Sequence, residues 1–388
     1  MNIERLHVSG YRSLRNVRLD LKQLNVIVGE NGSGKSNLYR ALQLLSTAAN
    51  GRFARELANE GGIRSVLWGG NRMKTESKRI TVEVAFEELN YKLSFGRVAF
   101  NAGIPYGLEC FRNDPKIKQE EISVNYRGKT NIIMRRQGNM ISAKNMDGRT
   151  IEYPLGLQGI ESVLSGLRDP QKFPELSELR EEFLNWRFYH NFRKDFDSPL
   201  RQPQRSVMTT VLSHDGFDLA AALKTIEAIG QPGELSDAIE EAFPGARLFI
   251  EDEDAELSLT LEMPGINRPF DASELSDGTL QYLCILAALM TERPPSLMIL
   301  NEPETSIHVD LYEPLAKLIT HASKRTQIIL TTHAQRLASF LKKHGDANVI
   351  ELEKIDGETR IKGARLVPPD EDEADDDENA SDQKTSLR

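Results

Sequence analysis

The chain has 388 residues, of which 39% are hydrophobic and 28% charged, a composition typical of a globular protein with room for two lobes or domains. No uninterrupted apolar run approaches the roughly 18 residues of a membrane-spanning helix, and the first ten residues lack the basic-then-apolar pattern of a signal peptide, so we expect a cytoplasmic protein with no membrane partner. The two cysteines lie far apart without a neighbouring histidine cluster, which argues against a zinc site and a disulfide framework.

The first 28 residues alternate between apolar and polar positions, which predicts two or three strands. The last of these strands covers residues 24–28, an apolar run typical of a buried strand. Residues 36–48 then have helical apolar spacing, with leucines at positions 38, 42 and 45. The sequence therefore predicts a strand and a helix joined by a short glycine-rich loop.

This loop fills the pattern G-x-x-x-x-G-K-S, in which Lys35 and Ser36 follow the second glycine. A plain glycine-rich turn is the simpler interpretation, but the spacing and the flanking strand and helix favour phosphate binding. Glycine lets backbone N–H groups approach a polyphosphate, and the helix N-terminus also favours an anion. Lys35 would contact the β- and γ-phosphates, and Ser36 would bind the bridging Mg²⁺. The predicted nucleotide cradle consists of Gly29, Glu30, Asn31, Gly32, Ser33, Gly34, Lys35, Ser36 and Asn37.

The middle of the chain changes from strand-like to helix-like patterns at Pro154. Four β-like runs between residues 79 and 153 are separated by Gly, Asn and Asp turns, which predicts an antiparallel meander. Helical patterns follow over residues 174–186 and 215–230, and a short β-like patch covers residues 246–263. We expect an antiparallel β subdomain followed by an inserted helical lobe.

The segment 185–205 interleaves basic and aromatic side chains. Such a composition suits phosphate contacts and base stacking in a nucleic-acid interface. The alternation over residues 186–190 equally suits a strand that buries its aromatics, with the arginines on the surface or in a dimer contact. The nearly neutral body of the chain does not favour DNA. The residues concerned are Trp186, Arg187, Phe188, Tyr189, Phe192, Arg193, Lys194, Phe196, Arg201 and Arg205.

After Asp271 the pattern alternates between helix and strand. Helices are predicted over residues 280–289, 311–321 and 334–341, and strands over residues 297–300 and 327–330. Continuous apolar strands separated by amphipathic helices indicate a parallel sheet covered on both faces. We therefore expect an α/β P-loop NTPase core built from both ends of the chain.

This interpretation divides the chain into four segments. Residues 1–153 form the first half of the core with the β subdomain, residues 154–264 the helical and mixed insertion, and residues 265–366 the second half of the core. Residues 370–388 contain nine acidic and two basic residues and so hold most of the formal net charge of −9. We expect residues 367–388 to be a disordered, solvated tail rather than a metal site.

Two polar residues follow the predicted strand 297–300, where ligands bind in open α/β sheets. Glu302 is the candidate general base or water-positioning residue for attack on a γ-phosphate, and Asn301 is the candidate metal-shell residue. His333 follows the next strand and would reach the same phosphate. Ser276 and Gly278 lie at the start of the helix before Glu302, where Ser276 on its own is a typical helix cap.

Together these segments resemble the ABC-type ATPases, in the branch that contains the SMC, RecF and OLD-like proteins. "GENGSGKS" resembles the Walker A motif, "LSDGT" the signature motif and "LMILNEPE" the Walker B motif with its catalytic glutamate. "TSIHVD" resembles the D-loop and "TTH" the switch histidine, and the order of all five is that of the family. The resemblance covers residues 1–100 and 265–355.

The resemblance implies an ABC ATPase head that binds ATP and Mg²⁺, with Lys35, Glu302 and His333 as catalytic residues. It also implies an ATP-dependent homodimer in which Ser276 and Gly278 of one protomer contact the γ-phosphate held by the other. Asn301 departs from the usual Walker B aspartate and would place a neutral amide near the metal. Gln158 is the best-placed candidate for the Q-loop glutamine.

Residues 90–271 lack sustained heptads, and only 55 residues follow His333, so neither coiled-coil arms nor a Toprim nuclease domain is expected. Three functions stay open. The first is a DNA-linked ATPase switch in DNA repair or antiviral defence. The second is an ATPase that controls a separately encoded effector, such as a nuclease, without touching DNA. The third is a transport ATPase, which the absence of a membrane-coupling segment disfavours.

Overall fold

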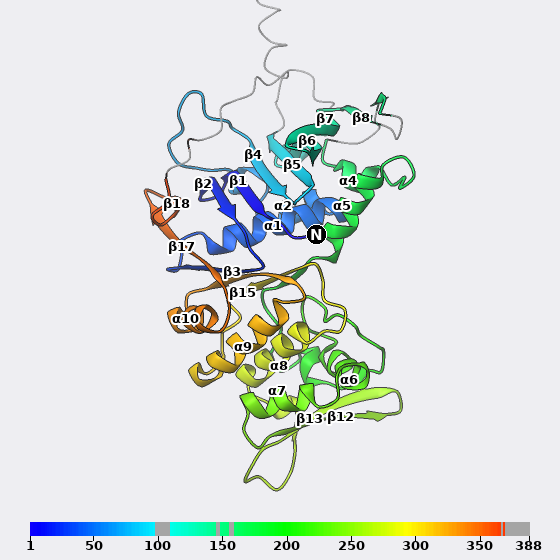
Figure 1. Cartoon of the computed structure of the whole chain (residues 1–388), viewed down its shortest axis with the longest axis vertical. Coiled ribbons are helices and arrows are strands. Elements are labelled where there is room, and N and C mark those ends of the chain that lie inside the picture. The colour runs from blue at the N-terminus through cyan, green and yellow to red at the C-terminus, as the bar shows by residue number, and fades with distance from the viewer. Residues whose placement is uncertain (98–108, 145–147, 155–158, 366–367, 369–388) are drawn as a thin grey trace, which may run out of the picture. The chain divides into compact units, whose positions relative to one another are not determined.

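The computed structural model describes residues 1–97, 109–144, 148–154, 159–365 and 368. It separates into two compact units, each described by itself below (Figure 1). Unit 1 contains Met1–Leu21, Glu30–Asn185 and the described residues from Leu352 onward, and unit 2 contains Lys22–Gly29 and Trp186–Glu351. The predicted acidic tail lies outside the described residues, apart from Pro368, and the four predicted segments stay a prediction.

Unit 1 is built on an eight-stranded antiparallel sheet with the order β2-β1-β4-β5-β6-β7-β8-β9. From β4 onward each strand pairs with the next one in the chain, so the predicted antiparallel meander is confirmed. The strands are β1 (Arg5–Tyr11), β2 (Leu14–Asp20), β4 (Ile80–Ala85), β5 (Leu89–Arg97), β6 (Pro115–Tyr126), β7 (Lys129–Gln137), β8 (Met140–Lys144) and β9 (Thr150–Pro154).

Helix α1 (Lys35–Asn50) packs against β1, β4 and three helices of unit 1, α2, α4 and α5. Its buried face includes Leu38, Leu42 and Leu45, which confirms the predicted helical stripe. The helix ends at Gly51, whose positive φ of 79° lets its N–H donate back to the Ala48 carbonyl. The remaining helices of this unit are α2 (Phe53–Asn59), α3 (Ile63–Val66), η1 (Glu109–Phe111), α4 (Val163–Gly166) and α5 (Pro174–Asn185).

Unit 2 contains a parallel sheet in which β10 (Arg187–Tyr189), β15 (Leu297–Asn301), β16 (Gln327–Thr332) and β3 (Leu24–Gly29) are neighbours in that order. Every residue of β15 and β16 is buried, which explains their continuous apolar sequences and confirms the predicted parallel sheet. Next to β3 lies β17 (Asn348–Ile355), whose second half belongs to unit 1 and pairs there with β18 (Glu358–Ile361).

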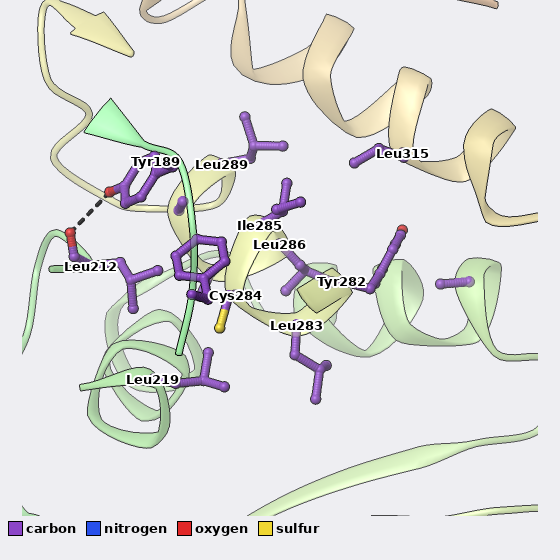
Figure 2. Close-up of a cluster of buried hydrophobic side chains, with 14 of the residues drawn as sticks. Tyr189, Leu212, Leu219, Tyr282, Leu283, Cys284, Ile285, Leu286, Leu289 and Leu315 are labelled. Carbon is purple, nitrogen blue, oxygen red and sulfur yellow. Dashed lines mark hydrogen bonds between the residues drawn. The ribbon is translucent and has the colours of Figure 1, made fainter. Parts of the chain in front are cut away.

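The core of unit 2 surrounds α8 (Asp277–Leu289), which is buried at every position from Leu280 to Leu289. Figure 2 shows its side chains together with Leu219 of α6, Leu315 of α9, and Tyr189 and Leu212. The Tyr189 hydroxyl donates to the Leu212 carbonyl over 2.9 Å (Figure 2). Burial also raises the pKa of the Cys284 thiol, as expected of a core residue.

Four more helices and a small antiparallel sheet complete unit 2 (Figure 1). The helices are α6 (Leu219–Ile229), α7 (Glu234–Ala242), α9 (Tyr312–Ala322) and α10 (Gln335–His344), with the short turns η2 (Pro199–Arg201), η3 (Ala272–Glu274) and η4 (Val309–Leu311). The small sheet contains β11 (Gln204–Arg205), β12 (Arg247–Glu253), β13 (Glu256–Glu262) and β14 (Phe270–Asp271). Within the described part of the chain, no helix is both long and apolar enough to span a membrane.

Candidate functional site

The predicted phosphate loop occupies unit 1 from Glu30 onward and follows β3 directly in the chain. Gly32 and Gly34 have φ values of 82° and 107°, a region that side chains rarely adopt. Helix α1 begins at Lys35 after Gly34, which offers no capping side chain to its first N–H groups. The buried Lys35 donates to the Glu30 carbonyl over 3.1 Å, and Ser36 is exposed. This geometry fits a polyphosphate at the helix N-terminus and an oxygen ligand for Mg²⁺.

Two residues outside the loop hold its backbone in place within unit 1. The Thr359 hydroxyl, on β18, donates to the Ser33 carbonyl over 2.8 Å and lies 2.7 Å from the Ser13 hydroxyl. A Cβ added to Gly34 would lie only 2.0 Å from the Thr359 hydroxyl oxygen, so this position has no room for a side chain. Neither Ser13 nor Thr359 was predicted as a site residue, because their contacts join residues that are more than 300 positions apart in the chain.

The parallel strands of unit 2 bring several polar residues to one edge of the sheet. Asn301 is buried at the end of β15, where its Nδ2 lies 2.6 Å from Nδ1 of His190 and its Oδ1 accepts a hydrogen bond from Thr331 over 2.8 Å. Both ends of the amide are therefore engaged within this unit, and the metal-shell role of Asn301 stays a prediction. His190 was missed, although the predicted strand 186–190 ends on it.

Glu302 and His333 lie close together at the same edge. His333 Nδ1 is 3.7 Å from Glu302 Oε1, and the two side chains keep 49% and 29% of their surface exposed. Glu302 has a φ of 50°, and its N–H donates to the Thr331 carbonyl over 2.9 Å. A left-handed backbone at a non-glycine residue costs about 1–2 kcal/mol and is typical of functional sites. The arrangement fits a base or water-positioning residue beside a histidine that faces solvent.

A second carboxylate, Glu304, lies beneath His333 with only 1% of its side chain exposed. Its Oε1 accepts hydrogen bonds from the Thr332 hydroxyl over 2.5 Å and from the His333 N–H over 3.2 Å. His333 Nδ1 is 3.4 Å from the same oxygen, while Oε2 of Glu304 has no hydrogen-bond partner within the described part of the chain. No role was predicted for this residue.

Ser276 and Gly278 begin α8 in unit 2. The exposed Ser276 hydroxyl accepts from the Thr279 N–H over 3.1 Å, so its predicted capping role is confirmed. A Cβ at Gly278 would lie 2.4 Å from the Ser306 carbonyl, so glycine lets the segment after β15 approach the helix. Contact of Ser276 with a second protomer stays a prediction, and Gln158 lies outside the described residues.

The arginine-rich and aromatic segment supports this helix start. Arg201 donates to the carbonyls of Ser273 and Leu275 over 3.1 and 2.7 Å and to Asp277 over 2.6 Å. Lys194 donates to Gln281 over 2.7 Å. Of the aromatics, only Phe196 is exposed, and β10 with its flanks buries the others, which confirms the structural alternative. The buried aromatics are Trp186, Phe188, Tyr189 and Phe192.

A comparison with protein families matches residues 24–339 to the family described as "AAA domain, putative AbiEii toxin, Type IV TA system". Two curated relatives are proteins named DNA replication and repair protein RecF. The one from Acidothermus cellulolyticus is 37% identical over 87 residues, or 22% of this chain and 23% of that protein. The one from Oceanobacillus iheyensis is 42% identical over 57 residues, or 14% of this chain and 15% of that protein. The chain therefore matches a quarter or less of the length of these relatives.

Among solved structures, the chain resembles an SMC head bound to the C-terminal winged-helix domain of ScpA, with a TM-score of 0.50 at 16% identity. That match covers 94% of this chain and 99% of the other. A second SMC head, with an extended coiled coil and bound to the C-terminal domain of ScpA from Pyrococcus furiosus, gives a TM-score of 0.50 at 14% identity and covers 100% and 99% of the two chains. At this identity the likeness shows the fold, an SMC-like P-loop ATPase head.

Proposed function

The chain belongs to this AbiEii-like AAA domain family and has the fold of SMC and RecF-like ATPases, and on that premise we propose that it binds Mg²⁺-ATP and hydrolyses it as a dimer. The observation that carries the proposal is the strand-end pair in unit 2. Glu302 and His333 directly follow the adjacent parallel strands β15 and β16, and Oε1 of Glu302 lies 3.7 Å from Nδ1 of His333 at the sheet edge where α/β sheets bind ligands. We propose this pair as the hydrolytic residues.

The chemistry follows from what each side chain offers. The loop from Glu30 to Asn37 supplies backbone N–H groups, and Lys35 supplies a positive charge for the phosphates. The exposed Ser36 hydroxyl would hold a Mg²⁺ ion, which would supply positive charge for the phosphate oxygens. The Glu302 carboxylate orients an attacking water or takes its proton, and His333 donates to a phosphate oxygen.

The dimer proposal rests on the start of α8. Ser276 is exposed although its hydroxyl caps the helix, so a nucleotide bound to another protomer has access to this side chain and to the N–H groups of the first turn. Gly278 lets the segment that carries Ser306 approach this helix start, because a Cβ there would lie 2.4 Å from the Ser306 carbonyl oxygen. We propose that the Ser276 surface closes on the nucleotide of a second copy and opens after hydrolysis.

Two uses of such a switch stay open. Similarity to proteins named DNA replication and repair protein RecF supports a DNA-linked role in repair, and a DNA-linked role in antiviral defence stays a prediction. A role in controlling a separately encoded effector, such as a nuclease, is favoured by the segment 186–205. Its aromatics are mostly buried, and Arg201 and Lys194 are bonded within unit 2. DNA-stimulated ATP turnover would support the first role, and turnover that only a protein partner changes would support the second.

The test of the hydrolase compares the wild type with Lys35→Ala and Glu302→Gln. We expect K35A to lose ATP binding, and E302Q to bind ATP but to hydrolyse it about a hundredfold more slowly. E302Q should also accumulate as a dimer when Mg²⁺-ATP is saturating, measured by light scattering. Glu313→Gln, on the surface of α9, is the matched control and should behave like the wild type. If K35A still binds ATP, the assignment of the phosphate loop is wrong. If E302Q stays monomeric in Mg²⁺-ATP, the proposed dimer is wrong.

A further inference from the structure

We propose that Glu304 is a positioning residue that fixes the ring of His333, with Nδ1 held at the carboxylates and Nε2 directed away from them toward the substrate phosphate. This proposal extends the proposed ATPase function, and the effect that it predicts on kcat rests on that function. The orientation of the His333 ring involves residues of unit 2 alone and is tested separately. Neither the predicted motifs nor the comparisons assign a role to Glu304.

The contacts of Glu304 converge on the end of β16. One oxygen, Oε1, accepts from the Thr332 hydroxyl and from the backbone N–H of His333. The Thr332 hydroxyl in turn accepts from the Ala334 N–H over 2.9 Å. Three consecutive residues are thereby tied to one buried carboxylate, so the backbone that carries the His333 ring cannot rotate without breaking these bonds.

The ring itself lies between two carboxylates. Nδ1 of His333 is 3.4 Å from Oε1 of Glu304 and 3.7 Å from Oε1 of Glu302. Carboxylate oxygens only accept hydrogen bonds, so the favoured tautomer carries its hydrogen on Nδ1. Because half of the His333 side chain is exposed, the other nitrogen is accessible. A proton on that nitrogen gives a cation that donates to an anionic oxygen.

The burial of Glu304 shows how costly this arrangement is. Its side chain is 1% exposed, and Oε2 is buried without a hydrogen-bond partner among the residues that the structure describes. A buried polar atom left unsatisfied typically costs about 1–3 kcal/mol, and more if it is charged. Glu304 also contributes, after burial, to the raised pKa of the nearby Tyr312 hydroxyl, as a neighbouring negative charge does. A leucine would avoid the cost, so the carboxylate is explained best by the ring that it holds.

The first test reads the tautomer directly in the nucleotide-free protein. ¹⁵N spectra of the histidine rings, with His333 assigned by its loss in H333Q, should show the Nδ1–H form in the wild type. In Glu304→Ala we expect the Nε2–H form to gain at least about threefold in population, because only the more distant carboxylate of Glu302, 3.7 Å from Nδ1, remains to favour Nδ1–H. Glu313→Ala removes a carboxylate 3.0 Å from His344 on the surface of the same unit and should leave His333 unchanged. An identical His333 tautomer in E304A and the wild type would overturn the inference.

The second test separates positioning from folding and from binding. E304A should lower kcat about tenfold to a hundredfold, while the Kd for Mg²⁺-ATP changes less than about twofold. An unchanged kcat, or a fall in affinity that accounts for the whole loss, would overturn the inference. Should E304A fail to fold, Glu304→Gln keeps one acceptor oxygen without the charge and should still shift the tautomer toward Nε2–H. A wild type without ATPase activity but with the Nδ1–H ring would refute the proposed hydrolysis and leave the positioning of His333 standing.

Discussion

Asn301 shows how one residue changes the chemistry at the end of a strand. An aspartate there would face His190 and Thr331 with two acceptor oxygens, whereas the amide offers one donor and one acceptor, which matches both neighbours. The neutral side chain also avoids a second buried charge beside Glu302 and Glu304. The departure from the usual Walker B aspartate is therefore accommodated by the hydrogen bonds of unit 2.

Asn301→Asp should make stability depend on pH. The new carboxylate accepts from Nδ1 of His190 only when that nitrogen carries a hydrogen, and protonation of the ring guarantees one. We expect the variant to be less stable than the wild type by about 1–3 kcal/mol at pH 8 and by clearly less at pH 5.5. Urea unfolding at the two pH values measures this difference. A destabilisation equal at both values would mean that His190 does not partner residue 301.

The site residues that could be predicted from the sequence are those that belong to a short local motif. Lys35 follows its glycines, and Glu302 and His333 each follow an apolar strand, so type and spacing suffice. Glu304 and Thr359 act through partners that are distant in sequence, 28 and 326 residues away. A hydrogen bond of that separation depends on how strands pair, which no single stretch of sequence specifies.

At the scale of elements, the hairpin of β17 and β18 supports the phosphate loop of unit 1. Besides the side-chain bonds of Thr359, its backbone N–H donates to the Ser13 carbonyl over 2.8 Å. The hairpin thus connects the turn between β1 and β2 to the loop. No periodic pattern predicts this, because residues 348–361 follow the last helix and resemble any short hairpin.

Thr359→Val should weaken nucleotide binding. The isosteric change leaves the Ser33 carbonyl without its donor, and an orphaned buried acceptor costs about 1–3 kcal/mol, so we expect the Kd for Mg²⁺-ATP to rise about tenfold. Isothermal titration calorimetry measures it. Thr359→Ser keeps the hydroxyl and should stay within about twofold of the wild type. Equal affinities for T359V and T359S would show that the hydroxyl does not hold the loop.

Arg201→Ala should loosen the start of α8. The guanidinium satisfies two carbonyls and Asp277, so we expect a loss of about 1–3 kcal/mol in the free energy of unfolding and faster amide exchange over residues 273–279. Arg193→Ala removes a pair with Asp195 in which both side chains are more than half exposed, and it should change stability by less than about 0.5 kcal/mol. Similar effects of the two substitutions would contradict this assignment.

The elements themselves were largely predictable, because periodicity identifies them locally. Residues 24–28, 297–300 and 327–330 are confirmed as parallel strands, and the run 79–153 as a meander. The neighbours of a strand were less predictable. The alternation over residues 186–190 allows a strand there, but nothing in the sequence specifies that this strand pairs with β15 or that Arg187 lies beside Met298.

At the scale of the molecule, Arg15 joins three distant segments of unit 1. It donates to both carboxylate oxygens of Glu76 over 3.0 and 2.7 Å and lies 3.8 Å from Glu358. Burial alone would raise the pKa of Glu76, but the hydrogen bonds from Arg15 and from the Met73 N–H outweigh it, so the pKa is lowered from its usual value of 4.5. The stabilisation is therefore present above about pH 4.5 and is lost as the pH falls through the lowered value.

Arg15→Ala should accordingly be most harmful at neutral pH. We expect it to cost about 1–3 kcal/mol at pH 7, because it leaves a buried carboxylate without its guanidinium partner, and progressively less as the pH falls below about 4.5 through the lowered pKa of Glu76. Guanidinium unfolding across this pH range measures the difference. Arg193→Ala serves as the exposed control, and its unfolding free energy should differ little from that of the wild type at both ends of the pH range. If the difference in unfolding free energy between the wild type and R15A grew as the pH fell, the ion pair of Arg15 with Glu76 would not be its cause.

The place of β3 in its sheet has a consequence for synthesis. Its Asn25 bonds to Ile328 of β16, a residue 303 positions later, and its other neighbour, β17, is made later still. At roughly 5–20 residues per second, this buried apolar strand leaves the ribosome about 15 to 60 seconds before either neighbour exists. Unit 2 cannot close until residues 327–355 have been made, so until then the nascent strand depends on a chaperone or on transient contacts to cover it. Chains that terminate before residue 327 should aggregate rather than accumulate as a folded fragment.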